Sequence, residues 1–421
     1  MNPARSIVTI FKKLRMRGFS AAAGALRVKL GERRAQAFYA GNLRRHRGET
    51  AVPGVTFIGD FAGRSSGGKV SRDFVLSLHR AGIPFQAAFK PADGDPSGNG
   101  VTELLTAPGD FNIMKHSHII EFCGGTSVPG GVPRVKARIV FWEFETGLCE
   151  YDPSCAGRNV IVAMSDFNRE VFRRALPAST PVAKILYPFH FPSGHLSKAE
   201  ARRKFNLPDG AFIVFFNFDY ESSYHRKNPY GAMRAFAEAF ADAPEALLVF
   251  KTQRAKKYGH RVDELARLAA DLGVAGRCMS FDSYLEETDL YSLTNACDVY
   301  LSLHRGEGFG LGVAEAMSLG KPVVVTDYSA TTEFCNRGNS FPVPYETVKV
   351  KPEMIDNTAY LFVKEWADPD VSFAAECLRR LRRDPGLAAE TGTRAREFIA
   401  GHFSTENFRR SVSEFLKLHH T

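Results

Sequence analysis

The segment HRGEGFGLGVAEAM, residues 304–317, places two glutamates around a glycine-rich turn. Glu307 precedes the turn, and Glu315 follows it in a sequence that favours a helix. Gly308 and Gly310 let the backbone approach a ligand closely, and free N–H groups at a helix N-terminus favour an anion. Carboxylates repel a phosphate but accept hydrogen bonds from hydroxyl groups. A sugar nucleotide carries both groups and fits the segment, although two glutamates at this spacing alone would more often be surface acids on a capped helix.

Strand-like and helix-like segments alternate on both sides of a boundary near residues 187–210, which is rich in Pro, Gly and His. Before it, hydrophobic segments start with VTFIGDF (55–61) and continue with PFQAAF, FNIMKHSHIIEF, RIVFWEF and NVIVAMS. After it, they resume with AFIVFFNF, ALLVFK, DVYLSL and PVVVT. Such alternation is typical of parallel sheets covered by helices. The sequence therefore predicts an α/β fold with two Rossmann-like domains that face a shared cleft.

The chain is expected to divide into four regions: a basic N-terminal arm (1–50), two Rossmann-like domains (51–192 and 193–403) and a C-terminal helix (404–421) that packs back on the first domain. The net charge of +9 belongs to the arm, which holds 12 Lys and Arg against two acids. The rest of the chain holds 43 against 44 and is close to neutral. This distribution, without a recognisable motif, argues against nucleic-acid binding.

Within the arm, Ile7, Ile10, Phe11 and Leu14 follow helical spacing with basic residues alongside. Such a helix either lies on an anionic membrane surface or packs on the domain, and its low serine content disfavours a transit peptide. No segment approaches the ~20 apolar residues of a membrane span. The seven cysteines show no CxxC spacing, which favours a reduced, cytoplasmic setting.

The longer segment EGFGLGVAEAMSLGKPVVVTDYSATTEF, residues 307–334, closely resembles the signature of family 4 retaining glycosyltransferases, which have the GT-B fold and include bacterial mannosyl- and glucosyltransferases. The resemblance covers the second domain well and the first domain loosely. It implies that Glu307 contacts the hydroxyls of the donor sugar, that Glu315 holds the ribose, and that Thr326 lies close to the donor. The backbone amides that it assigns to the sugar and phosphates are those of Gly308, Phe309, Gly310 and Leu311.

The same resemblance implies an arginine and a lysine on the donor diphosphate, in the region NFDYESSYHRKNP. Lys227 matches the lysine, but Asp219 or Tyr220 stands at the usual place of the arginine. Arg226, or Lys251 at the end of ALLVFK, would then supply the second cation. Without a metal, such cations and a helix terminus are what can offset the charge growing on the leaving group.

GRSSGGK (63–69) nearly spells a phosphate-binding P-loop, but Val70 stands where the motif needs Ser or Thr to ligate magnesium. This argues against a nucleoside triphosphatase. In the GT-B interpretation the segment is a glycine loop that faces the cleft. There Gly67 and Gly68 would lie near the donor and Arg64 near the acceptor.

Two further strand ends carry candidate residues. His118, preferred over His116, matches a family histidine that lies against the donor sugar. In FWEFE (141–145), Trp142 and Glu143 would bind a sugar acceptor by ring stacking and hydrogen bonding, against the alternative of an aromatic core. Ser165 resembles a family cleft position. DGD (93–95) matches the metal motif of another glycosyltransferase fold but reads as a solvated turn.

The resemblance thus implies transfer of a hexose, with retention, from GDP-mannose or a UDP-sugar to a glycan or lipid-linked acceptor in bacterial polysaccharide or lipopolysaccharide synthesis. It implies no metal and no cofactor. The expected setting is cytoplasmic, with the option of a peripheral position on the inner membrane face. A P-loop-like nucleotide hydrolase and a non-catalytic sugar-nucleotide-binding protein remain as alternatives, and a sugar epimerase is a weaker one.

Overall fold

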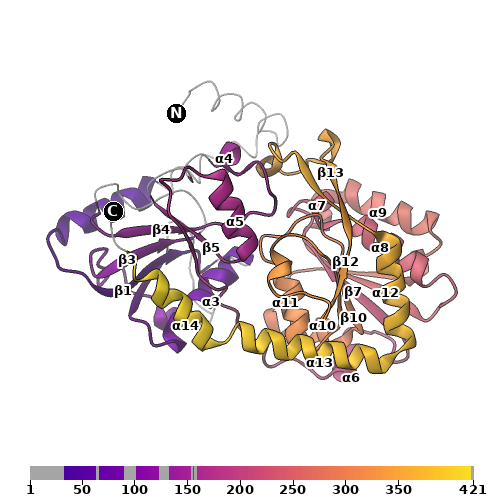
Figure 1. Ribbon diagram of the computed structural model, residues 1–421. Coiled ribbons are helices and arrows are strands. Elements are labelled where there is room, and N and C mark those ends of the chain that lie inside the picture. The colour runs from indigo at the N-terminus through magenta and orange to yellow at the C-terminus, as the bar shows by residue number, and fades with distance from the viewer. Residues whose placement is uncertain are drawn as a thin grey trace.

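The chain folds into two α/β domains, each built on a six-stranded sheet, and Figure 1 shows the two domains side by side. The computed structural model describes residues 33–62, 66–89, 101–122, 132–152, 155 and 159–418. Neighbouring strands are parallel throughout both sheets, and helices alternate with them along the chain. This architecture confirms the expected pair of Rossmann-like domains.

The first sheet has the strand order β2-β1-β3-β4-β5-β6. Its strands are β1 (Val52–Gly59), β2 (Phe85–Phe89), β3 (His116–Glu121), β4 (Val135–Ile139), β5 (Val160–Ala163) and β6 (Val182–Lys184). The helices of this domain include α3 (Ser66–Arg80), α4 (Leu148–Tyr151) and α5 (Asp166–Ala175), with the short 3-10 helix η1 (Thr102–Leu104). The N-terminus of α3 is directed to the carboxyl end of β1, where the cleft lies.

The second sheet has the strand order β12-β11-β10-β7-β8-β9. Its strands are β7 (Phe212–Asn217), β8 (Ala246–Thr252), β9 (Cys278–Asp282), β10 (Val299–Ser302), β11 (Val323–Thr326) and β12 (Phe341–Val343). The α-helices are α6 (Lys198–Lys204), α7 (Tyr224–Lys227), α8 (Pro229–Ala239), α9 (Gly259–Asp271), α10 (Glu287–Ala296), α11 (Leu311–Ser318), α12 (Val371–Arg383) and α13 (Pro385–His402). Short 3-10 helices are η3 (Ala255–Tyr258), η4 (Ala275–Arg277), η5 (Ser329–Glu333) and η6 (Pro352–Met354).

Local sequence explains where these elements begin. The central strands of the second sheet, β7, β10 and β11, are mostly apolar, as is typical of strands that helices cover on both faces, and all four residues of β11 are buried. Asn228 caps α8 by accepting a hydrogen bond from the Gly231 N–H at 3.1 Å, and Pro229 occupies the first helical position. Ser165 caps α5 in the same way, accepting from the Asn168 N–H at 3.1 Å.

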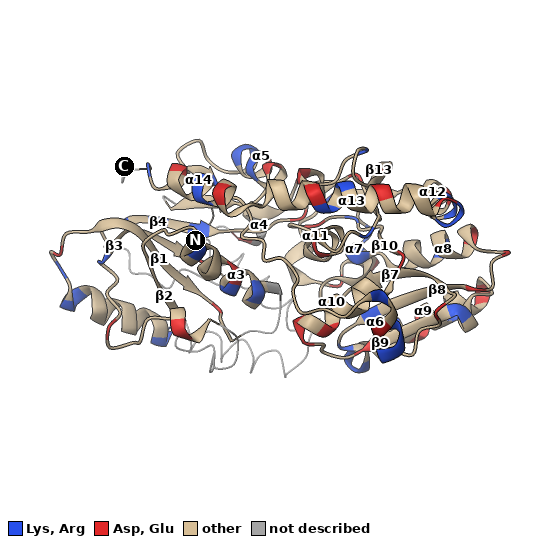
Figure 2. Cartoon of the chain, turned by 90° about the horizontal axis from the view of Figure 1, so that it is seen from below, with Lys and Arg blue, Asp and Glu red and all other residues tan. Residues whose placement is uncertain are grey.

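The last two helices join the domains. Figure 1 shows α13 running along the second domain toward the first, where α14 (Thr405–Phe415) packs. The Phe408 ring lies 5.6 Å from that of Phe74 on α3, and Arg409 Nε donates to the Ala81 carbonyl at 2.8 Å. The C-terminal helix therefore packs back on the first domain, as expected. Acidic and basic side chains are interspersed along α13 and α14, as Figure 2 shows.

Residues 33–45, at the end of the basic arm, form a helix that packs on the first domain. Tyr39 is fully buried, and Asn42 pairs with the backbone of Phe111 and Ile113 at 2.6 and 2.8 Å. Arginines of this helix point to solvent. This part of the arm thus supplies core side chains, while the segment with helical spacing around Ile7 lies outside the described residues.

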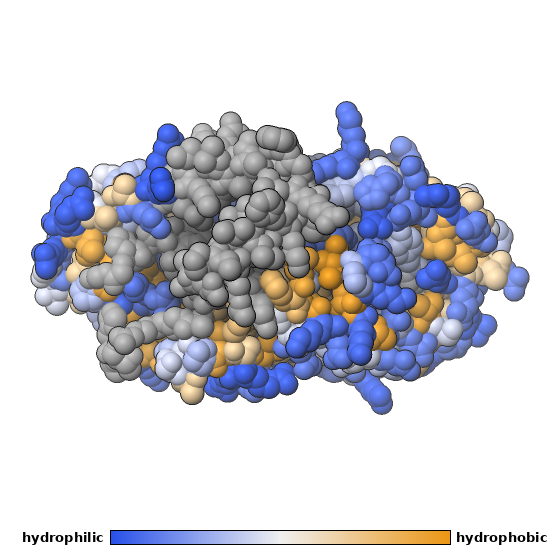
Figure 3. All heavy atoms as spheres, turned by 90° about the horizontal axis from the view of Figure 1, so that it is seen from above, coloured by the Kyte–Doolittle hydropathy of each residue, from blue (hydrophilic) through white to orange (hydrophobic). Residues whose placement is uncertain are grey.

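A hairpin of the second domain also reaches the first. β13 (Tyr345–Lys349) and β14 (Glu365–Pro369) pair antiparallel, and η7 (Thr358–Tyr360) lies between them. The Tyr360 ring lies 5.0 Å from that of Phe144, and the Lys364 N–H donates to Thr146 Oγ1 at 3.2 Å. Seen from above in Figure 3, the second domain shows apolar areas between hydrophilic side chains. The hairpin links the two domains at one side of the cleft.

Candidate functional site

A cavity of about 570 Å³ lies between the domains, at the carboxyl ends of strands from both sheets. Its first-domain wall comes from the N-terminal part of α3 and from segments that follow β3 and β4. Its second-domain wall comes from segments that follow β7, β8 and β10, and from the first turns of α11. Ligand sites of α/β proteins form at this position.

The glycine-rich turn between β10 and α11 borders this cavity. Gly310 has φ +90°, and a Cβ there would overlap the methyl group of Thr331, so the turn requires glycine. Phe309 stacks on Tyr187 of the first domain, with ring centroids 3.7 Å apart and planes at 10°. Residues 310–313 line the cavity, so the N-terminus of α11 and its positive dipole end face it.

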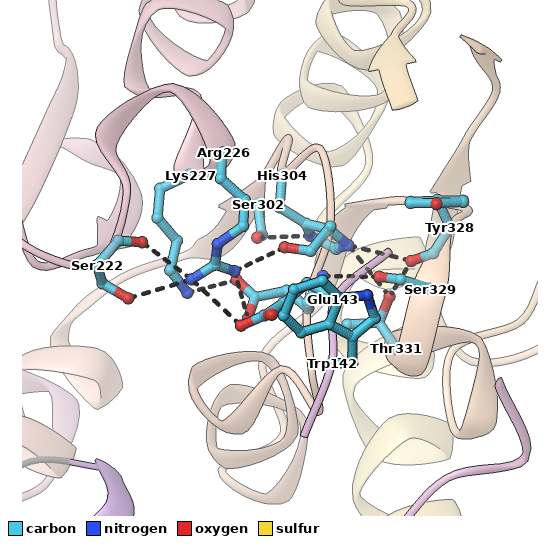
Figure 4. Close-up of polar contacts among 12 residues, drawn as sticks. Trp142, Glu143, Ser222, Arg226, Lys227, Ser302, His304, Tyr328, Ser329 and Thr331 are labelled. Atoms are coloured by element: carbon cyan, nitrogen blue, oxygen red, sulfur yellow. Dashed lines mark hydrogen bonds and ion pairs between the residues drawn. The ribbon is translucent and has the colours of Figure 1, made fainter. Parts of the chain in front are cut away.

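Glu307, which precedes the turn, forms a buried ion-pair cluster with Arg226 and Lys227 of α7, the two cations labelled in Figure 4. Its Oε1 lies 2.5 Å from Lys227 Nζ, and its Oε2 lies 3.4 Å from Arg226 Nη1. Burial acts to raise the pKa of Glu307, but the charges of Lys227 and Arg226 outweigh it and lower the pKa to about 2. Burial also lowers the pKa of Lys227, against the attraction of Glu307. Glu307 is therefore an ionised hydrogen-bond acceptor at any working pH.

Arg226 is held by several groups and is almost fully buried. Its guanidinium donates to the carbonyl oxygens of Gly306 and Ser222 at 2.7 and 2.9 Å and lies 5.7 Å from the Tyr360 ring centroid. Glu143 of the first domain lies 3.9 Å from the same guanidinium. Arg226 thus connects Glu307 with Glu143 of the first domain, and Figure 4 shows Arg226 close to Glu143 and Ser222.

The FWEFE segment places alternate side chains on opposite sides. Phe141 and Glu143 line the cavity, whereas Trp142 and Phe144 point into the core. Trp142 is 2% exposed and donates from Nε1 to the Thr146 carbonyl at 3.0 Å. The prediction of Trp142 as an acceptor-stacking ring is therefore wrong, because the two-residue period of an extended segment turns it inward. Burial raises the pKa of Glu143, and the positive charge of Arg226 opposes that rise only in part.

Glu315, in α11, faces a second charged cluster at the other side of the cavity. Its Oε1 lies 3.4 Å from Tyr291 Oη, and Lys69 of α3 approaches from the first domain. Lys69 Nζ lies 3.2 Å from carboxylate oxygens of both Asp73 and Glu287. Burial raises the pKa of Glu315 to about 7, against the attraction of Lys69. This carboxylate therefore changes charge near neutral pH.

Two basic residues, Lys251 near the end of β8 and Arg254 after it, line the cavity. Lys251 is 5% exposed, and burial lowers its pKa to about 8, with Asp282 acting in the opposite direction. Arg254 has a left-handed backbone with φ +66° and pairs with Asp219 and, at 3.1 Å, with Glu221. Asp219, at the place of the expected arginine, thus holds an arginine of the next loop at the cavity.

His118 does not reach the cavity. It lies in the middle of β3, its Nε2 is 3.0 Å from the Leu418 carbonyl oxygen, and its ring is 4.9 Å from that of Phe415. The strand continues to Glu121, and Phe122 is the residue of this segment that lines the cavity. The prediction of His118 at the donor sugar is wrong because His118 lies before the end of β3 and its side chain packs under α14.

Several other predicted residues also lie away from the cavity lining. Thr326, at the end of β11, is 1% exposed and does not line the cavity. Gly68 is buried in the first turn of α3, whereas Gly67 lines the cavity. Ser165 caps α5, and Arg64 lies outside the described residues. The predicted residues that the structure brings together around the cavity are Glu307, Lys227, Arg226, Lys251, Gly308, Phe309, Gly310, Leu311, Glu315, Gly67 and Glu143.

Sequence reasoning missed the contacts that connect the domains at the cavity. The sequence places Lys69 only at the end of a near P-loop, yet Lys69 and Arg72 both pair with Glu287 of the second domain, Arg72 at 3.5 Å. Tyr360, which lies outside every sequence motif, packs against Arg226. A run of Gly, Lys and Arg at the start of a helix was the available signal for Lys69; no local signal marks Tyr360.

Among the described residues, no three or more His, Cys, Asp or Glu side chains are grouped as metal ligands would be. None of the helices described in the chain combines the length and apolar character needed to cross a bilayer.

Comparison with known proteins finds a family model that matches the part of the second domain around this site. Residues 197–345 match the family model "Glycosyl transferases group 1", and this range includes the glycine-rich turn and the cations of α7 and β8. A stretch of 76 residues is 37% identical to the lipopolysaccharide core biosynthesis mannosyltransferase LpsB of Rhizobium meliloti. That match covers 18% of this chain and 21% of LpsB, so the chain aligns with about a fifth of that relative.

Solved structures share the fold across both domains. HepE of Anabaena, solved with UDP and glucose, has a TM-score of 0.61 and 14% identity, covering 87% of this chain and 99% of HepE. Sucrose-phosphate synthase of Thermosynechococcus elongatus has a TM-score of 0.58 and 14% identity, covering 86% of this chain and 98% of the synthase. At 14% sequence identity, the similarity to these structures shows a shared fold. The second domain is therefore a group 1 glycosyltransferase domain, set within a two-domain GT-B fold.

Proposed function

We propose that the chain is a retaining hexosyltransferase that moves a sugar from a nucleoside diphosphate to a saccharide acceptor. The observation that carries this proposal is that Glu307 and Glu315 both line the interdomain cavity, on either side of a glycine turn at a helix N-terminus. The amides suit a diphosphate, and the carboxylates suit hydroxyl groups. The group 1 domain and the fold of glycosyltransferases support the same reading.

In this proposal the donor lies along the second-domain wall. Glu315 accepts hydrogen bonds from the ribose, the N–H groups of residues 308–311 bind the diphosphate, and Glu307 accepts from hydroxyls of the sugar. The bond between the anomeric carbon and the phosphate oxygen breaks, and the acceptor oxygen bonds to that carbon on the same face. The acceptor's proton passes to the departing phosphate oxygen. The protein supplies orientation and charge stabilisation, and no side chain acts as nucleophile.

The acceptor would enter from the first-domain wall, where Glu143 lines the cavity. We propose a glycan or lipid-linked saccharide of bacterial polysaccharide or lipopolysaccharide synthesis, and GDP-mannose or a UDP-sugar as donor. The partial match to a lipopolysaccharide core mannosyltransferase and the UDP and glucose in HepE support these choices. A carboxylate on this wall suits hydroxyl groups of a sugar.

We further propose that the basic N-terminal region holds the enzyme on the inner face of the cytoplasmic membrane. Arg33, Arg34, Arg44 and Arg45 are exposed on the helix of residues 33–45, and each basic residue near an anionic surface contributes ~1 kcal/mol. Deletion of residues 1–32 removes seven of the twelve Lys and Arg of the arm and keeps the packed helix. It should lower binding to anionic vesicles but not to neutral ones, and replacing Arg33, Arg34, Arg44 and Arg45 by Gln should lower it further. Unchanged binding would contradict this part of the proposal.

A donor screen tests the main proposal. The purified chain is incubated with UDP-, GDP- and ADP-sugars and an extracted glycan acceptor, and release of the nucleoside diphosphate is measured with product formation. Glu307→Ala should lose turnover, whereas Glu346→Ala, at an exposed acid of β13, should not. ATP turnover without any sugar acceptor would instead identify a nucleotide hydrolase. Donor binding without transfer to any acceptor would identify a binding protein.

A further inference from the structure

The hairpin of β13 and β14, residues 345–369, belongs to the second domain by sequence, yet its side chains form part of the core of the first domain. Tyr360 and Trp366 are buried and belong to the same apolar cluster as Trp142 and Phe144. Their rings lie 5.0 and 6.4 Å from the ring of Phe144. The hairpin is therefore anchored in the first domain through buried aromatic side chains.

The same hairpin also holds α7, the short helix that carries both cations next to Glu307. Ser223, the residue before this helix, has a φ of +62°, and its side chain makes no capping hydrogen bond to the described helix. Asp356 of the hairpin caps the helix instead, because its Oδ2 accepts from the N–H groups of Tyr224 and His225 at 2.7 and 3.4 Å. The first N–H groups of a helix have no partner within it, so the hairpin supplies what the local sequence does not.

Arg305, which follows β10, connects α7 to the hairpin at a second point. Its Nη1 donates to the His225 carbonyl at 2.9 Å, and its Nη2 pairs with Asp368 of β14 at 2.8 Å. The Arg305 guanidinium also lies 5.4 Å from the centroid of the Trp366 ring. The position of α7 thus depends on the hairpin at two points, and through the hairpin on the first domain.

Tyr360 connects this support to the walls of the cavity. It does not line the cavity itself, but it contacts Glu143 and Arg226, which do. The Tyr360 hydroxyl donates a hydrogen bond to the Glu143 carboxylate, and the ring centroid lies 5.7 Å from the Arg226 guanidinium. Arg226 in turn lies 3.9 Å from Glu143 and 3.4 Å from Glu307. One side chain of the hairpin therefore supports groups on both walls.

We propose that the hairpin is a positioning element for sugar transfer, in which Tyr360 orients Glu143 toward the acceptor and Asp356 holds α7 beside the donor. This inference rests on the proposed function for the reaction, whereas the contacts of the hairpin do not depend on it. Fast transfer requires the two reacting atoms to be held roughly 3–3.5 Å apart and in line. The hairpin suits that requirement because it is anchored in one domain and bonded to a helix of the other.

Loss of the Tyr360 hydroxyl should have a signature that loss of packing would not have. Burial raises the pKa of Glu143, and the negative charge of Glu307 adds to that rise. Arg226, the hydrogen bond from Tyr360 and the charge of Lys227 oppose it. Removal of the hydroxyl should therefore raise the pKa of Glu143 further. The carboxylate would then become protonated, and stop accepting from two acceptor hydroxyls at once, at a higher pH.

Steady-state kinetics with saturating donor and the extracted glycan acceptor test the role of Tyr360. Tyr360→Phe keeps the ring and should lower kcat/KM for the acceptor by ~10-fold, with the acid limb of its pH profile moved to higher pH. Calorimetric affinity for UDP, GDP or ADP should stay the same. In a Glu143→Ala background, Tyr360→Phe should change the rate by less than about twofold, because no carboxylate remains to be oriented. Tyr345→Phe, which removes an exposed hydroxyl of the same hairpin, is the matched control.

Hydrogen exchange tests the role of Asp356 without reference to activity. Asp356→Ala should speed amide exchange of the first residues of α7 by ~10-fold and leave exchange in α13 unchanged. Asp356→Asn keeps an acceptor oxygen and should restore most of the protection. Glu353→Ala, at an exposed acid of η6, is the control.

Thermal unfolding verifies that each variant is folded. An unchanged acceptor kcat/KM and pH profile in Tyr360→Phe, or an equal loss with and without Glu143, would overturn the role of Tyr360. Unchanged exchange in Asp356→Ala would overturn the hold of the hairpin on α7. The proposed function fails separately: faster exchange in Asp356→Ala, without sugar transfer by the wild type from any donor, would support that hold while contradicting a glycosyltransferase.

Discussion

Lys227 Nζ lies 2.5 Å from Glu307 Oε1, and the two side chains are largely buried between the glycine turn and α7. Arg226 shares the carboxylate at 3.4 Å, so one acid is balanced by two cations. Such a cluster fixes the orientation of Glu307 before any ligand enters, which is how a preorganised acceptor for sugar hydroxyls should be built. The pair lies between residues 80 positions apart.

Removal of one partner should expose how strongly this pair is coupled. Lys227→Met should lower the free energy of unfolding by ~2–3 kcal/mol, less than a fully orphaned buried charge, because Arg226 remains. The double variant Lys227→Met/Glu307→Gln should regain most of that stability but not turnover. Urea unfolding and steady-state kinetics measure the two effects. A single variant as stable as wild type would show that the pair is not formed in solution.

Glycine at position 310 should be indispensable for the turn. Gly310→Ala should cost ~1–3 kcal/mol of stability, because φ is +90° and the added methyl group meets Thr331. It should also abolish nucleotide binding by moving the N-terminus of α11. Thermal unfolding and calorimetry measure both effects. Gly276→Ala is the control, since a Cβ there meets no atom within 4 Å, and equal behaviour of the two variants would refute the argument.

Nucleotide affinity should be greatest between pH 7 and pH 8, by the pKa values of Glu315 and Lys251. Below about 7, protonation of Glu315 removes an acceptor for the ribose, and above about 8, deprotonation of Lys251 removes the attraction to the diphosphate. The charged groups around Glu315 are Lys69, Asp73 and Glu287, and Asp282 is the carboxylate that acts on Lys251. Calorimetry with UDP or GDP from pH 5.5 to 9.5 measures the profile.

Two variants test which residue causes the loss of nucleotide affinity on each side of the pH optimum. Glu315→Gln should flatten its acid side, and Lys251→Met should flatten its alkaline side. A wild-type affinity that stays constant across the range would contradict the placement of both groups at the nucleotide.

Lys251→Met should stabilise the ligand-free protein while weakening its binding of nucleotide. A pKa of about 8 in the folded state, against an ordinary 10.5, means that the folded state resists protonation. The free energy of unfolding of the wild type should therefore rise as pH increases from 8 to above 10.5. Below pH 8 it should be lower, by up to ~3 kcal/mol, than its value above pH 10.5. At pH 7, replacement by Met should raise the midpoint of urea unfolding. A lower midpoint would indicate that the ammonium has a partner that stabilises the fold.

Local patterns were sufficient to predict the fold and one wall of the site. The strand, glycine turn and helix around Glu307 and Glu315 are continuous in sequence, so their placement at the carboxyl end of β10 follows from local rules. His118 and Trp142 could not be placed in this way. His118 lies three residues before the end of β3, and Trp142 lies one step of the two-residue period away from Phe141 and Glu143, so neither side chain reaches the cavity.

The remaining contacts of the site form between segments that are far apart in the sequence. Lys227 has its partner 80 positions away, and Lys69 of the first domain has one 218 positions away in Glu287. Nothing in either local sequence specifies those pairs, because they depend on how the two domains meet. The same is true of Tyr360, which packs on Arg226 from the hairpin between β13 and β14.

The most direct test of the central claim is a crystal structure of the chain with the nucleoside diphosphate that it releases. The ribose hydroxyls should lie within ~3.2 Å of the Glu315 carboxylate, and the diphosphate oxygens should lie on the amides of residues 308–311 and the Lys251 ammonium. A nucleotide bound elsewhere on the molecule, with Glu307 and Glu315 free of any ligand contact, would rule out the proposed donor site.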